Sequence, residues 1–178
     1  MNEKSSIRNR LLKERLQIHP KERELAEKKI SVELKQILAS QKGPLGFYWP
    51  VRGEFDPRQV VKDWLFVNIT NTACLPVIVE KNNPMVFREW IPGQPMIKGT
   101  FNIDVPHPKN RILIPNIILV PTLGFNQKNF RLGYGGGYYD RTLPQYKALT
   151  IGLCFEHGMF CDIAEEKHDM PLDLVIVG

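Results

Sequence analysis

The sequence has few cysteines and no long apolar run. Cys74, Cys154 and Cys161 are the only cysteines in 178 residues, and no C-x-x-C pair occurs. So sparse and odd a set favours buried thiols in a reducing compartment over disulfides. No stretch approaches the roughly 18 apolar residues of a membrane span, and the charged N-terminus is unlike a signal peptide. These absences argue against a secreted disulfide scaffold and a membrane protein, and they predict a cytoplasmic location.

The composition is that of an ordinary globular protein, but the charge is unevenly spread. Hydrophobic residues make up 43% of the chain and charged residues 24%, which predicts one domain over residues 1–178. The net charge is +5, and all of it lies in residues 1–42, where 11 Lys and Arg stand beside 6 Glu. This excess is either a solvated helix face or a surface that meets an anion.

Helical patterns and short apolar runs follow one another along the chain. Residues 3–40 are expected to form two helices divided at Pro20, because proline starts a helix but does not fit inside one. Continuous apolar strands between helices predict an α/β fold with a partly parallel sheet, flanked by helices and carrying the N-terminal helices 1–42. Strands are expected at 45–49, 73–79, 85–90, 112–120, 150–155 and 172–177, helices at 58–66, 138–149 and 161–166, and a long connection at 91–110.

The most informative stretch is a glycine-rich loop between an expected strand and an expected helix. Four glycines in five positions let backbone N–H groups turn inward and a ligand approach closely. A helix that begins after the loop adds the positive end of its dipole. These are the parts of a phosphate-binding loop, and arginines bracket it: Arg131-Leu132-Gly133-Tyr134-Gly135-Gly136-Gly137-Tyr138-Tyr139-Asp140-Arg141.

Three other interpretations of this loop can be weighed. A P-loop is excluded because no Lys-Ser or Lys-Thr pair follows the glycines. A dinucleotide-binding fingerprint keeps Gly133 and Gly135 but has Tyr138 at the third glycine, and the loop begins about a dozen residues after the strand. A mobile glycine turn is the third interpretation, and the arginines, tyrosines and aspartate around the glycines argue against it.

The loop closely resembles the signature R-L-G-x-G-x-G-Y-Y-D of the 5-formyltetrahydrofolate cyclo-ligase (5,10-methenyltetrahydrofolate synthetase) family. The resemblance runs nearly end to end, with K-x-x-x-R at Lys4 and Arg8, a strand-end loop at 48–54 and H-D-x-x-x-D at 168–173. It implies a fold similar to the ribose-5-phosphate isomerase and CoA-transferase group. It also implies an ATP- and magnesium-dependent ligase that converts 5-formyltetrahydrofolate into 5,10-methenyltetrahydrofolate, with ADP and phosphate as the other products.

The same resemblance implies a role for each matched position. Lys4 and Arg8 would contact the phosphates of ATP. Arg131 and Tyr138 would be catalytic, and Asp140 and Asp173 would hold magnesium. The remainder of the ATP site would be Arg131, Leu132, Gly133, Tyr134, Gly135, Gly136, Gly137, Tyr138 and Tyr139. The folate would be contacted by Trp49, Glu54, Tyr134, Gly135, Gly136, Gly137 and Tyr138.

The reaction calls for residues of these kinds. A formyl amide is a poor electrophile, and phosphorylating its oxygen creates a leaving group that N10 of the same molecule can displace. Lysine and arginine neutralise phosphate charge, and magnesium needs only one or two carboxylates beside phosphate oxygens and waters. Ionised Glu54 can accept hydrogen bonds from pterin N–H groups, and the Trp49 ring can stack on the pterin.

Each assignment also has a structural alternative. Lys4 and Arg8 could lie on a solvated helix face. Glu54 could cap the helix that follows Pro57, and Trp49 could belong to the core. For the whole protein, the alternatives are a nucleotide-binding homologue without this activity, a dinucleotide-dependent oxidoreductase and a basic nucleic-acid-binding module. The N-terminal segment lacks the aromatic residues of such a module, so the expected partners are folate and ATP, without nucleic acid, membrane or a second subunit.

The carboxylates and the segment before the loop leave further choices open. Asp140 could pair with Arg141 or cap its helix, and Asp173 could end a turn. The family's F-D-x-x-G has become Phe-Asn-Gln-Lys-Asn at 125–129, where Asn126 keeps an acceptor but loses a charge. Asn129 can still take the left-handed conformation that a glycine would take.

Overall fold

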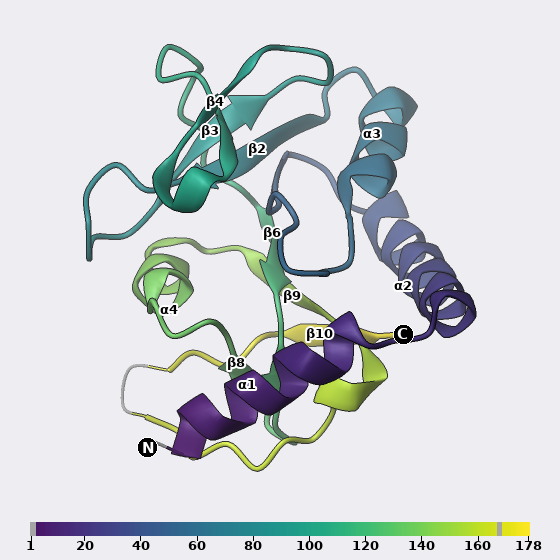
Figure 1. Ribbon diagram of the computed structural model, residues 1–178. Coiled ribbons are helices and arrows are strands. Elements are labelled where there is room, and N and C mark those ends of the chain that lie inside the picture. The colour runs from purple at the N-terminus through teal and green to yellow at the C-terminus, as the bar shows by residue number, and fades with distance from the viewer. Residues whose placement is uncertain (1–2, 167–168) are drawn as a thin grey trace.

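A six-stranded sheet lies at the centre of the protein (Figure 1). The computed structural model describes residues 3–166 and 169–178. The strand order is β10-β9-β6-β1-β2-β3; neighbours from β10 to β2 run parallel, and β3 pairs antiparallel with β2. The expected partly parallel α/β sheet is therefore confirmed. Its strands are β1 (Pro44–Gly46), β2 (Thr72–Val77), β3 (Val86–Trp90), β6 (Ile117–Pro121), β9 (Leu149–Cys154) and β10 (Leu174–Val177).

Helices cover both faces of this sheet. Along β6, Ile117 and Leu119 face the side of α2 (Pro20–Ala39) and α3 (Arg58–Val67), whereas Ile118 and Val120 face the opposite side, as the period of two in a strand requires. The short helix α4 (Tyr138–Thr142) and the 3₁₀ turn Leu143–Gln145 lie on that second side. Both faces are thus buried, which explains the continuous apolar strands.

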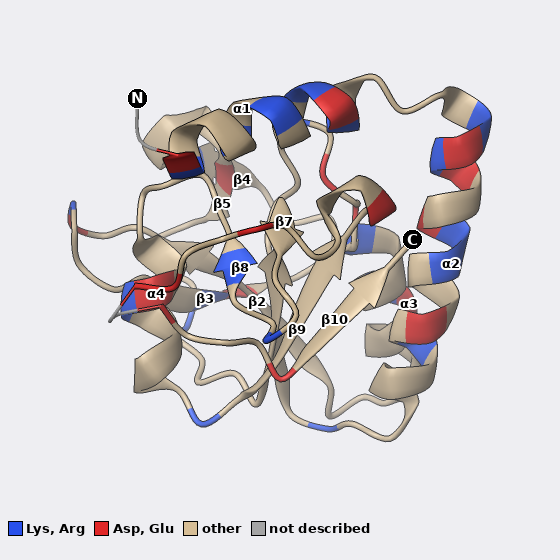
Figure 2. Ribbon diagram, turned by 90° about the horizontal axis from the view of Figure 1, so that it is seen from below, with Lys and Arg blue, Asp and Glu red and all other residues tan. Residues whose placement is uncertain are grey.

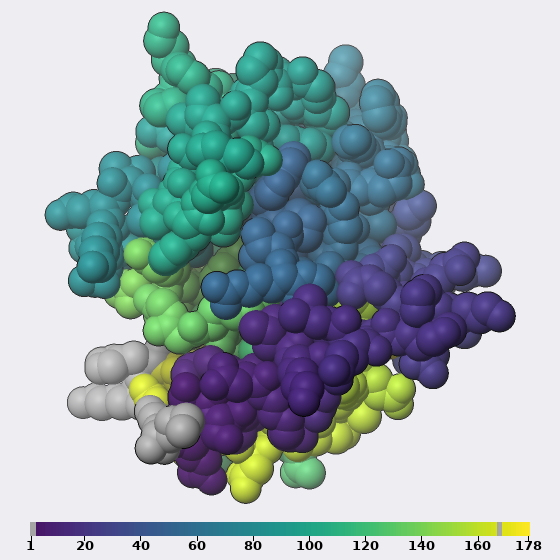
Figure 3. Space-filling view, in the orientation of Figure 1, coloured from purple at the N-terminus to yellow at the C-terminus, as the bar shows by residue number. Residues whose placement is uncertain are grey.

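The first helix, α1 (Glu3–Leu16), packs at the edge of this core rather than over the sheet. Its buried residues are Leu11 and Arg15, and Leu11 packs with Leu123 and Leu132 in a small cluster of its own. Figure 3 shows α1 lying beside the C-terminal segment of the chain. The division of residues 3–40 at Pro20 is confirmed, since Pro20 is the first residue of α2.

The basic excess of the N-terminal segment does not form a patch of one sign. Figure 2 shows Lys and Arg interleaved with Asp and Glu along α2. Arg23 pairs with Glu27 one turn later at 2.8 Å, and Lys35 pairs with Asp63 of α3 at 2.7 Å. Exposed pairs of this kind contribute little stability. The face of α2 is therefore a solvated, mixed-charge surface.

One expected helix is shorter than predicted and another is wrong. Residues 138–149 form only the five-residue α4 and one 3₁₀ turn, because Pro144 cannot donate within a helix and blocks its continuation. Residues 161–166 are irregular. The Cys161 N–H donates to the carbonyl of Phe125 at 2.8 Å, so the backbone of this segment bonds to β7 (Gly124–Phe125) and not within a helix.

Several strand boundaries also differ from expectation: the strand expected at 45–49 is Pro44–Gly46, and the one expected at 172–177 begins at Leu174. The run 112–120 pairs as a sheet strand only from Ile117, because Pro115 interrupts it, and Ile112 instead forms an isolated bridge with Arg88. The expected connection 91–110 contains a small hairpin of β4 (Met96–Lys98) and β5 (Asp104–Pro106). A second two-stranded pair joins β7 to β8 (Arg131–Leu132) and so leads directly into the glycine loop.

Candidate active site

A cavity of about 570 Å³ opens at the carboxyl ends of β1, β2 and β6. Tyr48 and Trp49 follow β1, and Pro121 ends β6. The chain order of the strands reverses between β1 and β6, and this is where α/β sheets place their ligands. In Figure 3, α1, the loop after β1, the β4–β5 hairpin and the segment of the glycine loop gather on one face.

The cavity brings together residues that are far apart in the sequence. Its walls include every position expected to contact ATP or folate: Lys4, Arg8, Trp49, Glu54, Arg131, Leu132, Gly133, Tyr134, Gly135, Gly136, Gly137, Tyr138 and Tyr139. Asp140 lines the same cavity. This grouping is geometric, and the role of each residue stays a prediction.

Arginine head groups lie directly against the glycine loop. Arg8 donates from Nε to the carbonyl of Gly133 at 2.9 Å. A Cβ on Gly133 would overlap the Arg131 guanidinium, and one on Gly137 would lie 2.5 Å from Nη1 of Arg141. Gly137 also has a φ of +65°, a conformation that L side chains rarely adopt. The backbone conformation therefore favours glycine at 137, whereas an added Cβ at 133 or 137 would displace the end of a flexible arginine side chain.

Arg131 is held firmly at the wall of the cavity. Its side chain is 6% exposed and pairs through Nη2 with Oδ1 of Asp140 at 2.8 Å, while its guanidinium lies 5.2 Å from the Tyr139 ring centre. Among the described residues, neither Nε of Arg131 nor the Tyr139 hydroxyl has a hydrogen-bond partner, although both atoms are buried. Such donors are costly to leave unsatisfied.

Lys4 lies at the cavity, not on a solvated face. Its Nζ contacts Oε1 of Glu166 at 2.8 Å and Oδ2 of Asp169 at 3.2 Å. Burial works to lower the pKa of Lys4, but hydrogen bonds to the two carboxylates outweigh it and leave the pKa raised. The ammonium is therefore charged at neutral pH and already positioned by anionic oxygens.

Glu54 is a buried carboxylate held by two donors. It is 7% exposed, and its oxygens accept from the Val51 N–H at 2.8 Å and from the Tyr134 hydroxyl at 2.9 Å. Burial raises the pKa of Glu54 even though both hydrogen bonds act to lower it. Its carboxylate caps the turn at Val51 and not α3, whose N-cap is Pro57. The capping alternative is therefore wrong, and the carboxylate faces the cavity.

Comparison with known proteins agrees with this geometry. The model of the 5-formyltetrahydrofolate cyclo-ligase family matches residues 1–178. The chain belongs to that family.

Curated relatives and solved structures of this family cover nearly the whole chain. The 5-formyltetrahydrofolate cyclo-ligase of Mycoplasma genitalium is 28% identical over 99% of this chain and 98% of its own, and that of Haemophilus influenzae is 24% identical over 98% and 97%. The solved 5,10-methenyltetrahydrofolate synthetase of Aquifex aeolicus superposes with a TM-score of 0.81 at 26% identity, covering 98% of this chain and 89% of that one. In the described part of this cyclo-ligase family member, no helix is both long and apolar enough to cross a bilayer.

The family's two expected metal carboxylates are not brought together. Asp140 lines the cavity, whereas Asp173 does not; its Oδ2 accepts from the N–H and the hydroxyl of Thr150 at 2.8 and 2.7 Å. Asp173 therefore joins the starts of β9 and β10. The other aspartate of the same motif, Asp169, does line the cavity. Asp140 pairs with Arg131, so the alternative in which it pairs with Arg141 is wrong.

Some site residues were missed by motif reasoning. Phe101 lines the cavity from the turn between β4 and β5, and its ring lies edge-on to Tyr138 with centres 6.1 Å apart. The surrounding segment had been interpreted as a plain connection, so nothing in its pattern drew attention to this residue. Arg15 was also missed. It follows Lys4 by 11 residues, about three helical turns, and this spacing could have placed it on the same face.

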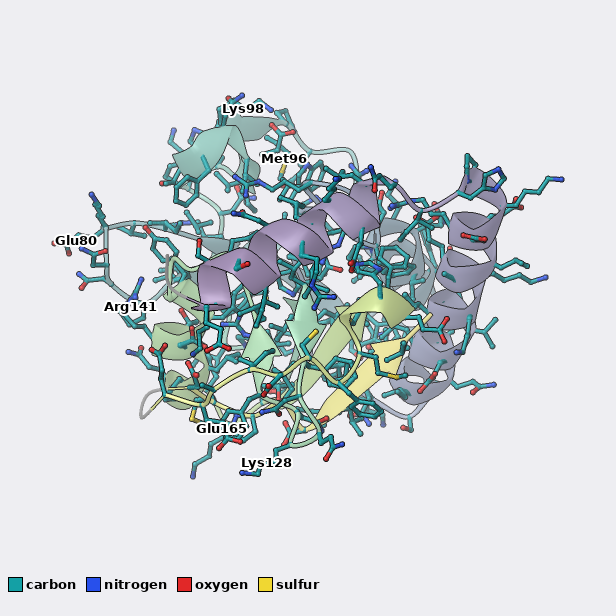
Figure 4. The ribbon with its side chains drawn as sticks, turned by 60° about the horizontal axis from the view of Figure 1, so that its bottom comes forward. Glu80, Met96, Lys98, Lys128, Arg141 and Glu165 are labelled. Atoms are coloured by element: carbon teal, nitrogen blue, oxygen red, sulfur yellow. The ribbon has the colours of Figure 1, made fainter. Side chains whose placement is uncertain are left out.

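The segment before the glycine loop keeps its shape despite its altered sequence. Asn129 has a φ of +62°, which confirms that it takes the left-handed conformation. The Asn126 side chain accepts from the backbone N–H groups of Lys128 and Phe130 at 2.9 and 3.0 Å, so the amide oxygen serves in place of the family's carboxylate. Lys128 pairs with Glu165 at 2.9 Å, and the two lie near one another in Figure 4.

Proposed function

We propose that the protein cyclises 5-formyltetrahydrofolate to 5,10-methenyltetrahydrofolate and consumes ATP, with release of ADP and phosphate. Membership of the family over the whole chain supports the reaction. The observation that carries the proposal for this cavity is the glycine loop, where the Gly133 carbonyl accepts from Arg8 and the Tyr134 hydroxyl donates to the buried carboxylate of Glu54. A cavity of about 570 Å³ lies within the usual range for small-molecule sites.

The cationic end of the cavity is proposed to bind the phosphates of ATP. Lys4 and Arg8 approach from α1, and Arg131 approaches from β8. Lysine acts as a point charge, while arginine offers a planar pair of donors for phosphate oxygens. In this proposal the phosphate oxygens replace the carboxylates that now contact Lys4.

The Glu54 end is proposed to bind the folate. An ionised carboxylate accepts N–H donors of the pterin ring. Trp49 offers a ring for stacking, although Arg58 covers one face with its guanidinium 4.5 Å from the ring centre. Tyr138 and Phe101 form an aromatic pair further along the wall and suit the rest of the ring system.

Magnesium fits this cavity only in partnership with a bound phosphate. Among residues 3–166 and 169–178, no group of three or more His, Cys, Asp and Glu side chains could hold a metal. Magnesium prefers one or two carboxylates with phosphate oxygens and waters, and Asp140 and Asp169 are the carboxylates placed to provide them. When bound, the ion would neutralise phosphate charge. Asp173 is not among the residues that line this cavity, and its Oδ2 accepts two hydrogen bonds from Thr150.

The chemistry needs positioning more than covalent help from the protein. The formyl oxygen attacks the γ-phosphorus of ATP, the bond to the ADP oxygen breaks, and Arg131 stabilises the charge that develops on the phosphoryl oxygens. N10 then attacks the formyl carbon, the C–O bond breaks, and phosphate leaves with the former formyl oxygen. The N10 proton ends on phosphate. Tyr138 is proposed to shape the wall beside the reacting formyl group.

The setting of the enzyme also belongs to the proposal. A cytoplasmic, monomeric enzyme without nucleic-acid or membrane partners is supported by the mixed charge of α2 and by three buried free thiols. A dinucleotide-dependent oxidoreductase is disfavoured because Tyr138 replaces the third glycine of that fingerprint.

The proposal is tested by incubating the protein with 5-formyltetrahydrofolate, ATP and magnesium and following the methenyl product and ADP together. Wild-type protein should form both in equal amounts, and Arg131→Gln should lower kcat by about a hundredfold or more, as for loss of other charge-stabilising donors. Arg111→Gln is the matched control, since Arg111 is an exposed partner of Glu89 outside the cavity. Binding of ATP without formation of the methenyl product would contradict the proposed activity and would favour a nucleotide-binding homologue.

A further inference from the structure

We infer that Arg15 is a positioning residue that orders the folate side of the site through the Tyr134 hydroxyl. Arg15 is 2% exposed, although it is a charged residue in the most polar helix of the protein. Its Nη1 donates to the Tyr134 oxygen at 2.8 Å, and its Nη2 donates to the carbonyl of Thr122, just after β6, at 3.0 Å. The inference rests on the proposed function, because it gives Glu54 its role toward folate.

The direction of these hydrogen bonds is fixed by their chemistry. A guanidinium only donates, so the Tyr134 oxygen must accept from Arg15. The single hydroxyl proton of Tyr134 is then directed to Oε1 of Glu54, 2.9 Å away. The Tyr134 hydroxyl therefore has no proton left for a ligand, and only its ring is available to the cavity. Tyr134 acts as a relay between a buried cation and a buried anion.

This relay connects three separate segments. Arg15 belongs to α1, Tyr134 to the glycine loop, and Glu54 to the loop after β1. No carboxylate in the described part of the chain forms a direct ion pair with Arg15. The positive charge of Arg15 is instead linked to the carboxylate of Glu54 through the Tyr134 hydroxyl. Removing the guanidinium would leave α1 bonded to the glycine loop through Arg8, and the Tyr134 hydroxyl would lose the donor that directs its proton to Glu54.

A buried charge of this kind is poor evidence for a role in stability. Apolar residues of similar size often replace buried charged networks without loss of stability. Here Nε of Arg15 has no partner among the described residues, so the burial is not even fully compensated. The geometry of the site is the more direct explanation for an arginine at this position. It predicts that replacing Arg15 changes folate binding more than it changes the free energy of unfolding.

The test compares the dissociation constants of 5-formyltetrahydrofolate and ATP, each measured alone by calorimetry. Arg15→Met should weaken folate binding about tenfold or more, in line with a lost charged hydrogen bond, and should change ATP binding by less than about threefold. Tyr134→Phe should weaken folate binding similarly, and the double variant should be no worse than either single one, because the two act as one unit. Arg15→Lys should restore part of the affinity.

Arg10→Met is the matched control on the same helix, since Arg10 is exposed and pairs only loosely with Glu14 at 3.5 Å. It should leave both constants unchanged. Equal weakening of folate and ATP by Arg15→Met, unchanged folate binding, or additive losses in the double variant would overturn the role of Arg15. Failure of the wild-type protein to bind 5-formyltetrahydrofolate would instead refute the proposed function, and the positioning role with it.

Discussion

At the scale of single residues, Glu54 shows how burial and function oppose each other. Its native pKa lies above the unfolded value of 4.5 because burial disfavours the charged form. The native state therefore binds this proton more tightly than the unfolded state does. The contribution of Glu54 to the free energy of unfolding is greatest below pH 4.5 and falls as the pH rises through the native pKa. The charged group that folate binding needs thus costs stability at neutral pH.

The same shift predicts the pH dependence of folate binding. As the pH is lowered, Glu54 gains its proton at a higher pH than an exposed glutamate would, so affinity for 5-formyltetrahydrofolate should begin to fall above the ordinary carboxylate range. Glu54→Gln should bind weakly and without this acidic limb. Calorimetric titrations across the acidic range check the prediction. An acidic limb that persists unchanged in Glu54→Gln would assign it to another group.

Residue identity alone predicted part of this site. Lys4 and Arg8 came from a motif match, because their spacing alone favoured a solvated helix face. Asp169 and Asp173 belong to one motif, and only the fold shows that Asp169 faces the cavity while Thr150 engages Asp173. A side chain's direction depends on packing around it, which no local pattern encodes.

At the scale of elements, the glycine loop owes its shape to contacts as much as to backbone freedom. Gly137 precedes α4 with a φ of +65°, and a Cβ there would meet Arg141. Gly137→Ala should therefore lower stability by about 1–2 kcal/mol through the left-handed conformation. It should also displace the Arg141 head group, which donates from Nη2 to the carbonyl of Gly136 at 2.8 Å, and by loosening the loop it should weaken ATP binding.

Gly93 provides the matched control, because its φ is +84° and nothing lies within 4 Å of an added Cβ. Gly93→Ala should lose similar stability but keep its affinity for ATP. Thermal unfolding and nucleotide titration of both variants separate the two effects. Equal ATP affinity in the two variants would show that the Gly137 contact with Arg141 has no bearing on the site.

Long periodic elements were predictable, and short ones were not. The 20 residues of α2 and the apolar runs of the sheet follow their own periodicity. The irregular segment 161–166 depends on a hydrogen bond to a residue far away in the sequence. The strands of the β4–β5 hairpin are only three residues long, too short to show a period of two. Pro115 and Pro144 explain the two boundaries where expected elements were too long.

At the scale of the whole molecule, the fold gathers a site from four parts of the chain. Lys4, Glu54, Arg131 and Asp169 line one cavity because five parallel strands end near the same edge and α1 crosses beside it. The fold class followed from periodicity, but strand order and the docking of α1 are long-range properties. The family resemblance had linked Lys4, Glu54 and Arg131 but assigned Asp173 rather than Asp169, and the structure shows that Asp169 lines the cavity.

The central claim is that ATP phosphorylates the formyl oxygen of the folate in this cavity. The most direct test supplies 5-formyltetrahydrofolate labelled with ¹⁸O in the formyl group, together with unlabelled ATP and magnesium, and analyses the phosphate by mass spectrometry. The account predicts one labelled oxygen in each phosphate released for each methenyl product formed. Methenyl product accompanied by unlabelled phosphate would contradict it, because the formyl oxygen would then have left by another route.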